Sequence, residues 1–132
     1  MACSARTLCC IAGLFVLAQV RETVAQAPTP MFDGTYSGPM TLIANNAKSR
    51  TGCDGDHSNM MMTIRSGTFL FNYDPPRNTV ITGTVAADGS LNGFGKSYFG
   101  GAKLSGRIQG NAVIGQAGSG YCTFSLQLTK RQ

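Results

Sequence analysis

Residues 79–116 read TVITGTVAADGSLNGFGKSYFGGAKLSGRIQGNAVIGQ, and this stretch decides the fold. Three short turn signals divide it: DG at 88–89, GG at 100–101 and GN at 110–111. Between the turns, β-branched and apolar residues alternate with polar ones, which is the period of a half-buried strand. Asp-Gly is a strong hairpin signal because both residues accept positive φ. The stretch therefore predicts consecutive antiparallel strands.

The same pattern extends from residue 31 onward, where Gly, Asn, Asp and Pro recur every 8 to 12 residues. No segment after residue 30 has a helical period. Eight strands joined by short turns do not lie flat, so they curl or close. We expect an all-β fold with one disulfide, either an antiparallel up-and-down eight-stranded barrel or a tightly coiled β-sandwich. The predicted strands are 35–43, 60–65, 68–73, 79–86, 90–99, 102–109, 112–116 and 121–130.

Alternation along the strands separates an apolar, inward face from an outward one. The predicted inward sets are Met60, Met62 and Ile64; Phe69, Phe71 and Tyr73; Leu104, Gly106 and Ile108; and Cys122, Phe124, Leu126 and Leu128. Four glycines, Gly83, Gly93, Gly106 and Gly115, belong to a weak internal repeat and fall on or near this face. They either let the sheet bend tightly or leave interior space for a ligand.

Residues 1–25 resemble a signal peptide in their organisation. Arg6 supplies a positive start, an apolar run follows at 8–18, and small residues lead up to Ala25. The run is too short to span a hydrocarbon layer, which needs about 20 residues. We expect cleavage after Ala25, a single domain at 26–132 with no transmembrane segment, and release into the periplasm or the medium.

The segment after residue 25 keeps nine of 11 basic residues, five of six acidic residues, and only two of the five cysteines, Cys53 and Cys122. In an oxidising compartment two cysteines are most simply one structural disulfide. A metal pair or a redox pair is the alternative. Neither has a C-x-x-C spacing or a nearby His/Cys set to support it.

The one long connection, at 44–59, is the candidate ligand-binding loop, because function tends to lie on long loops held by a rigid scaffold. Its spacing lacks the glycine and glutamate of an EF-hand, and no third group supports a dyad of His57 with Ser49 or Ser58. A solvated turn is the alternative interpretation. We expect no metal, no cofactor and no catalytic residue. The candidate ligand-binding residues are Lys48, Arg50, Asp54, Asp56, His57 and Asn59.

The excess of basic residues suggests a second kind of surface. Arg65, Lys96 and Arg107 alternate outward from apolar neighbours. Such a face either is merely solvated or contacts anionic lipid headgroups, envelope polymers or an acidic partner. Aromatic residues do not interleave with it as they do in single-strand nucleic-acid binders, so we expect no nucleic-acid partner.

Residues 32–38, FDGTYSG, resemble the opening strand of the calycins, the lipocalin, fatty-acid-binding and avidin group, which begin with G-x-W or G-x-Y. The resemblance implies an up-and-down barrel with a small-molecule cavity, and a basic residue of the last strand, Lys130 or Arg131, packed over Tyr36. The chain has no Trp, which argues against a biotin site of the avidin type. The glycine-rich hairpins and the last strand also resemble small exported bacterial β-proteins.

These observations favour an exported, monomeric, non-enzymatic binding module that holds a small apolar or amphipathic molecule. The acid and base inventory is too poor to favour an enzyme. The alternative function is an interaction protein or inhibitor, which would act on an exported enzyme or an envelope component through the 45–59 loop or the basic face.

Overall fold

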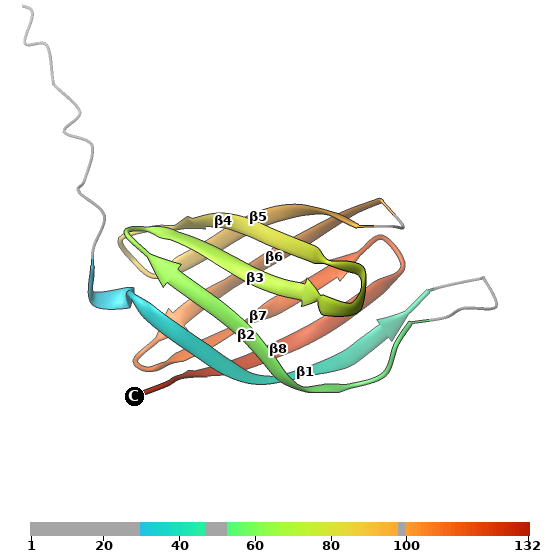
Figure 1. Cartoon of the computed structure of the whole chain (residues 1–132), viewed down its shortest axis with the longest axis horizontal. Coiled ribbons are helices and arrows are strands. Elements are labelled where there is room, and N and C mark those ends of the chain that lie inside the picture. The colour runs from blue at the N-terminus through green and yellow to red at the C-terminus, as the bar shows by residue number, and fades with distance from the viewer. Residues whose placement is uncertain (1–29, 47–52, 98–99) are drawn as a thin grey trace, which may run out of the picture.

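The computed structural model describes residues 30–46, 53–97 and 100–132. Eight strands close into one antiparallel barrel in which each strand pairs with its sequence neighbours and β1 pairs with β8 (Figure 1). The predicted all-β fold is confirmed. Of the two predicted architectures, the structure is the closed barrel and not the β-sandwich. The elements are η1 (Pro30–Phe32), β1 (Gly34–Asn45), β2 (His57–Arg65), β3 (Thr68–Asp74), η2 (Pro75–Arg77), β4 (Thr79–Val85), β5 (Ser90–Ser97), β6 (Gly100–Gln109), β7 (Ala112–Ser119) and β8 (Cys122–Lys130).

The strands β1, β2, β3, β6 and β7 are longer than predicted, and β2 and β7 each gain three residues at one end. β2 begins at His57 instead of residue 60, and β7 continues to Ser119 instead of residue 116. Both extensions are polar or glycine-rich, so they carry no apolar alternation, but backbone pairing with a neighbouring strand extends them all the same. Within the described part of the chain, no helix is long and apolar enough to cross a membrane.

The barrel has two distinct ends (Figure 1). The β2–β3, β4–β5 and β6–β7 turns lie at one end with η1 and the C-terminus, and we call it the η1 end. The β1–β2, β3–β4 and β7–β8 connections lie at the other, with Cys53 and Cys122, and we call it the disulfide end. The η1 end is covered by Phe32, which packs against the core and accepts a hydrogen bond from the Tyr36 hydroxyl at 2.9 Å.

Side chains from all eight strands fill the barrel. The predicted inward sets are confirmed, except that Gly106 and Cys122 are only half-buried at their positions. The large fully buried side chains are Tyr36, Met40, Met62, Ile64, Phe71, Ile81, Leu91, Leu104, Val113, Leu126 and Leu128.

The four inward glycines bring neighbouring strands together. Gly83 lies opposite Gly93, and Gly106 lies opposite Gly115. A Cβ on Gly106 would come 2.6 Å from the carbonyl oxygen of the neighbouring strand, and a Cβ on Gly93 would overlap the Phe69 ring. At these positions the bending interpretation is therefore right, and the interpretation as ligand space is wrong.

Lys130 packs over Tyr36 at the η1 end, in the manner that the calycin resemblance implied. Its Nζ lies 5.9 Å from the centre of the Tyr36 ring. Its aliphatic stem crosses Gly34, where a Cβ would come 2.6 Å from Lys130 Cε, and the φ of Gly34 is +147°. Gly34, Tyr36 and Lys130 thus pack together in one layer at the η1 end.

Candidate functional site at the disulfide end

The predicted disulfide joins Cys53 to Cys122, with the two Cα atoms 5.7 Å apart. Cys122 faces inward and packs against the core. Cys53 Sγ lies 3.3 Å from Asn45 Oδ1 and 3.7 Å from the carbonyl oxygen of Tyr121. A disulfide sulfur carries no hydrogen, so these are sulfur–oxygen contacts and not hydrogen bonds. The bond therefore fixes Cys53 at the inner edge of the opening.

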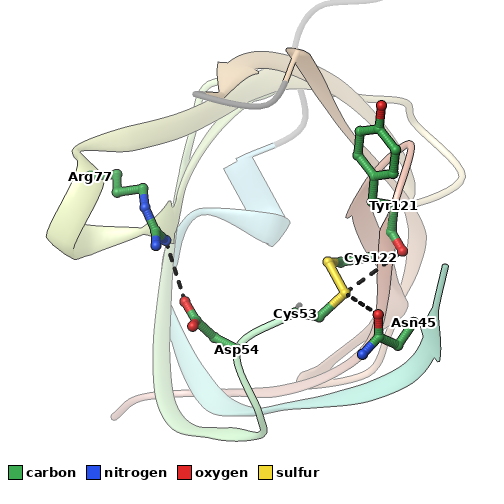
Figure 2. The surroundings of a disulfide bond; sticks show 6 residues. All are labelled: Asn45, Cys53, Asp54, Arg77, Tyr121 and Cys122. Carbon is green, nitrogen blue, oxygen red and sulfur yellow. Dashed lines mark hydrogen bonds and ion pairs between the residues drawn. A yellow bond between two sulfur atoms is a disulfide. The ribbon is translucent and has the colours of Figure 1, made fainter. Parts of the chain in front are cut away.

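Residues 53–56 form a strap across this opening. Cys122 holds it on β8, and on the opposite side Arg77 donates to Asp54 at 3.3 Å (Figure 2). Arg77 also donates to Asp74 at 2.8 Å, and these two carboxylates raise the pKa of the guanidinium. Because β8 and the β3–β4 connection lie three to four strands apart around the barrel, the strap spans the opening from side to side.

Asp56, a predicted ligand-binding residue, has a structural partner instead. Its Oδ1 accepts a hydrogen bond from the backbone N–H of Leu42 at 2.8 Å. The adjoining part of β1 contains a bulge, since Leu42 pairs with Phe124 and Ala44 with Thr123. The carboxylate therefore satisfies a backbone donor at an irregular part of the ladder, and it joins the end of the strap to β1.

His57 turns toward the barrel interior because of a second bulge. Gly38 pairs with Met60 and Met40 pairs with His57, so three steps on β2 oppose two on β1. Without the extra residue, strict alternation from Met60 would place His57 outside; bulges re-aim side chains in this way. The His57 ring is half-buried, with its centre 6.0 Å from that of Phe124.

Asn59 lies on the outer surface and does not join this group. Its Oδ1 accepts a hydrogen bond from Arg131 at 3.4 Å, and the same guanidinium donates to Ser37 Oγ at 2.7 Å. Lys48 and Arg50 lie outside the described residues. The structure therefore brings together Asp54, Asp56 and His57 of the predicted binding residues.

The interior beneath the strap has small and large side chains. Ala102, Ala117 and Gly95 are the small buried residues there, and Tyr73 and Phe124 are the large ones. Thr79 is 4% exposed and shares the inward face of β4 with Ile81. Its hydroxyl has no hydrogen-bond partner among the residues that the structure describes. A buried hydroxyl without a partner is costly, so this atom marks the lining as unusual.

Two aromatic side chains face the same space. The Tyr73 and Phe124 ring centres are 6.1 Å apart in an edge-on arrangement. Burial raises the pKa of the Tyr73 phenol above its ordinary value, and the nearby Ser119 offsets part of this rise. The Tyr73 phenol, the Thr79 hydroxyl and the His57 imidazole thus give a mostly apolar lining a few polar points.

Sequence reasoning missed Thr79, Tyr73 as a site residue, and Arg77. Thr79 follows the two prolines of η2 and begins β4, where the alternation with Ile81 already placed it inward. Arg77 carried no local signal, because its partner Asp54 is 23 residues away. Ion pairs between separate connections depend on which connections meet, and this is a property of the closed topology.

Neither a search for metal-ligand clusters nor the comparison with known proteins assigns a function to this site. No group of three or more His, Cys, Asp and Glu side chains in residues 30–46, 53–97 and 100–132 is placed to hold a metal ion. No protein-family model, curated protein or solved structure matches the chain significantly. The calycin resemblance therefore remains a prediction.

Proposed function

We propose that this protein is an exported, non-enzymatic binding module that holds a small apolar or amphipathic molecule beneath the strap. The observation that carries the proposal is the buried Thr79 hydroxyl, which has no hydrogen-bond partner among the described residues and lies on the inward face of β4 near the disulfide end. Small-molecule sites are mostly apolar and contain a few placed polar groups. Ala102, Ala117 and Phe124 supply the apolar part here, and Thr79 and Tyr73 supply the polar part.

The strap explains how such a molecule would be retained. The disulfide anchors one end of the strap covalently, whereas Arg77 holds Asp54 through an exposed ion pair. Exposed ion pairs are weak, so the Asp54 side is the one that opens. A ligand would enter beside Arg77, and the covalent anchor would keep the strap in place over it.

Native mass spectrometry of protein purified from the exported fraction tests the proposal directly. A ligand should appear as a mass adduct, and Thr79→Val, which keeps the shape and removes the hydroxyl, should weaken its retention. Thr84→Val, the same change on the outer face of β4, is the control and should retain the adduct. Protein that is always free of adducts would count against a ligand.

A packing measurement does not depend on knowing the ligand. If space exists beneath the strap, Ala102→Leu should change the free energy of unfolding little. Val113→Leu, in the filled half of the barrel, should cost about 1–3 kcal/mol because overpacking strains a full core. A similar or larger loss for Ala102→Leu would mean that this end is also full, and the proposal would fail.

A second function is favoured by a separate observation at the same rim. Ile43 is 52% exposed and Tyr121 is 51% exposed, beside the base of the candidate loop. Exposed apolar side chains of this size are typical anchors for a protein partner. An interaction protein or inhibitor would use this rim. A pull-down from envelope extract that recovers one partner with the native chain, and loses it with Tyr121→Ser, would support this role.

A further inference from the structure

The charges of the barrel are separated between its wall and its rims. In the residues that the structure describes, Asp33, Asp54, Asp56, Asp74 and Asp88 all lie in connections or at a strand end. The cations within the strands lie on the wall, and those on its outer surface are Arg65, Lys96, Lys103 and Arg107. On this wall Arg107 pairs with Asp88 at 3.5 Å, whereas Arg65, Lys96 and Lys103 have no carboxylate partner among the described residues.

A shallow, polar groove of about 180 Å³ runs along the outer wall over β6, β7 and β8. Gly118 forms part of its floor, between Lys103 on β6 and Thr123 on β8, which are its two cross-strand neighbours. A side chain at 118 would overlap the backbone of β8, so this part of the floor must stay bare. The lining residues that offer polar groups or backbone are Lys103, Ser105, Gln116, Gly118, Ser119 and Thr123.

An exposed aromatic ring lies directly beside this groove. Phe94 pairs with Lys103 across β5 and β6, so Lys103 stands between the ring and the groove. The Phe94 ring rests on Gly101, where a Cβ would come 2.5 Å from Phe94 Cε2. The Cε2–Cζ edge of the ring therefore lies against backbone, and the side chain as a whole is 54% exposed. This arrangement is a preorganised stacking platform.

We infer that Phe94, Lys103 and the groove form a binding site for an acidic polysaccharide. The apolar face of a sugar ring stacks on Phe94, and the next sugar lies in the groove, where Gln116, Ser105 and Thr123 offer amide and hydroxyl groups to its hydroxyls. Lys103 pairs with the acidic substituent between them, as a charge-assisted hydrogen bond. An anionic membrane fits less well, because the side chains of the groove are hydroxyls, an amide and one lysine, which match sugar hydroxyls better than lipid acyl chains.

Calorimetric titration with oligogalacturonate tests the inference. Lys103→Gln and Phe94→Ala should each weaken binding roughly tenfold, because a charge-assisted hydrogen bond or a stacked ring is worth about that factor. The matched controls are Arg65→Gln, which removes the same charge from another part of the wall, and Leu70→Ala, which removes another exposed apolar side chain. Both controls should stay within about twofold of the unaltered chain.

The choice of probe distinguishes the possible sources of the acid. Binding of oligogalacturonate assigns the site to carboxylated sugars. Binding of sulfated dextran alone, with the same dependence on Lys103 and Phe94, assigns the same site to sulfate esters. The inference is overturned if no saccharide binds, if neutral dextran binds equally, if only anionic vesicles bind, or if Arg65→Gln loses as much as Lys103→Gln. Circular dichroism of every variant verifies the barrel.

Discussion

At the scale of single residues, glycines that allow close strand approach should be intolerant of even one methyl group. A Cβ on Gly93 would overlap the Phe69 ring and lie 2.7 Å from the carbonyl oxygen of Thr82. We expect Gly93→Ala to lower the free energy of unfolding by about 1–3 kcal/mol, measured by chemical denaturation, because overpacking strains the core. Gly55→Ala is the control, since nothing lies within 4 Å of its Cβ. Equal stability of the two variants would contradict this account.

Two buried phenols should make the protein sensitive to alkali. Burial raises the pKa of Tyr73 and of Tyr36, and Asp33 raises that of Tyr36 further. The unfolded chain releases these protons near pH 10, while the folded chain still holds them. The stabilisation is therefore full below about pH 10 and declines as the pH rises toward the raised folded values. Denaturation between pH 8 and 11 should show this decline, and Tyr73→Phe together with Tyr36→Phe should reduce its slope. An unchanged slope would exclude these phenols as its cause.

Residue types predicted local structure well and site membership less well. Alternation correctly placed Met62, Phe71 and Leu126 inward, because the apolar and polar residues of a strand by themselves indicate which side chains face the core. It did not place His57, because the predicted strand began at residue 60 and the bulge that turns this ring inward is an extra residue with no marker in the sequence. Asn59 was named as a binding residue on loop composition alone, and it faces outward to Arg131.

At the scale of elements, the strap has two anchors, the disulfide and the Arg77–Asp54 ion pair, and each can be removed by mutation without the other. On the chain-entropy model, replacing Cys53 and Cys122 together with Ser should lower the free energy of unfolding by about 4 kcal/mol, because their separation is 69 residues. Asp54→Asn leaves the disulfide in place and should leave global stability unchanged, since the ion pair is exposed.

Hydrogen exchange distinguishes the two anchors. Asp54→Asn should raise exchange in residues 53–56 and leave the strands protected, because only the weak side of the strap is released. The double Cys→Ser variant should raise exchange in the strap and in the first residues of β8. Equal protection of the strap in all three proteins would mean that neither anchor holds it.

The disulfide was predictable from the sequence, whereas the strap was not. Cys53 and Cys122 remained as the only pair after the predicted signal peptide, so elimination sufficed. The position of Arg77 opposite Cys122 depends on the β3–β4 connection and β8 lying across the opening from each other. No local sequence pattern indicates which two connections lie across the opening from each other.

At the scale of the whole molecule, the closed barrel joins the two ends of the chain. The turn signals at 88–89, 100–101 and 110–111 predicted a meander and left open a closed barrel or a sandwich, and the pairing of β1 with β8 decides for the barrel. Closure depends on how much the sheet coils, and the paired glycines Gly83 with Gly93 and Gly106 with Gly115 allow the coiling. The sequence showed these glycines but left open whether they bend the sheet or leave space.

Closure also sets how the barrel should fold. Tyr36 pairs with Lys130, so closing the barrel joins residues that are far apart in the chain, and such non-local pairing folds slowly. The disulfide ties the start of β2 to the start of β8 in the unfolded chain and lowers the entropy that closure must overcome. Refolding of the oxidised protein should therefore be several-fold faster than that of the double Cys→Ser variant, with similar unfolding rates, in stopped-flow experiments over a range of urea concentrations. If only the unfolding rate changes, the β1–β8 seam forms after the transition state, because interactions absent from that state slow unfolding alone.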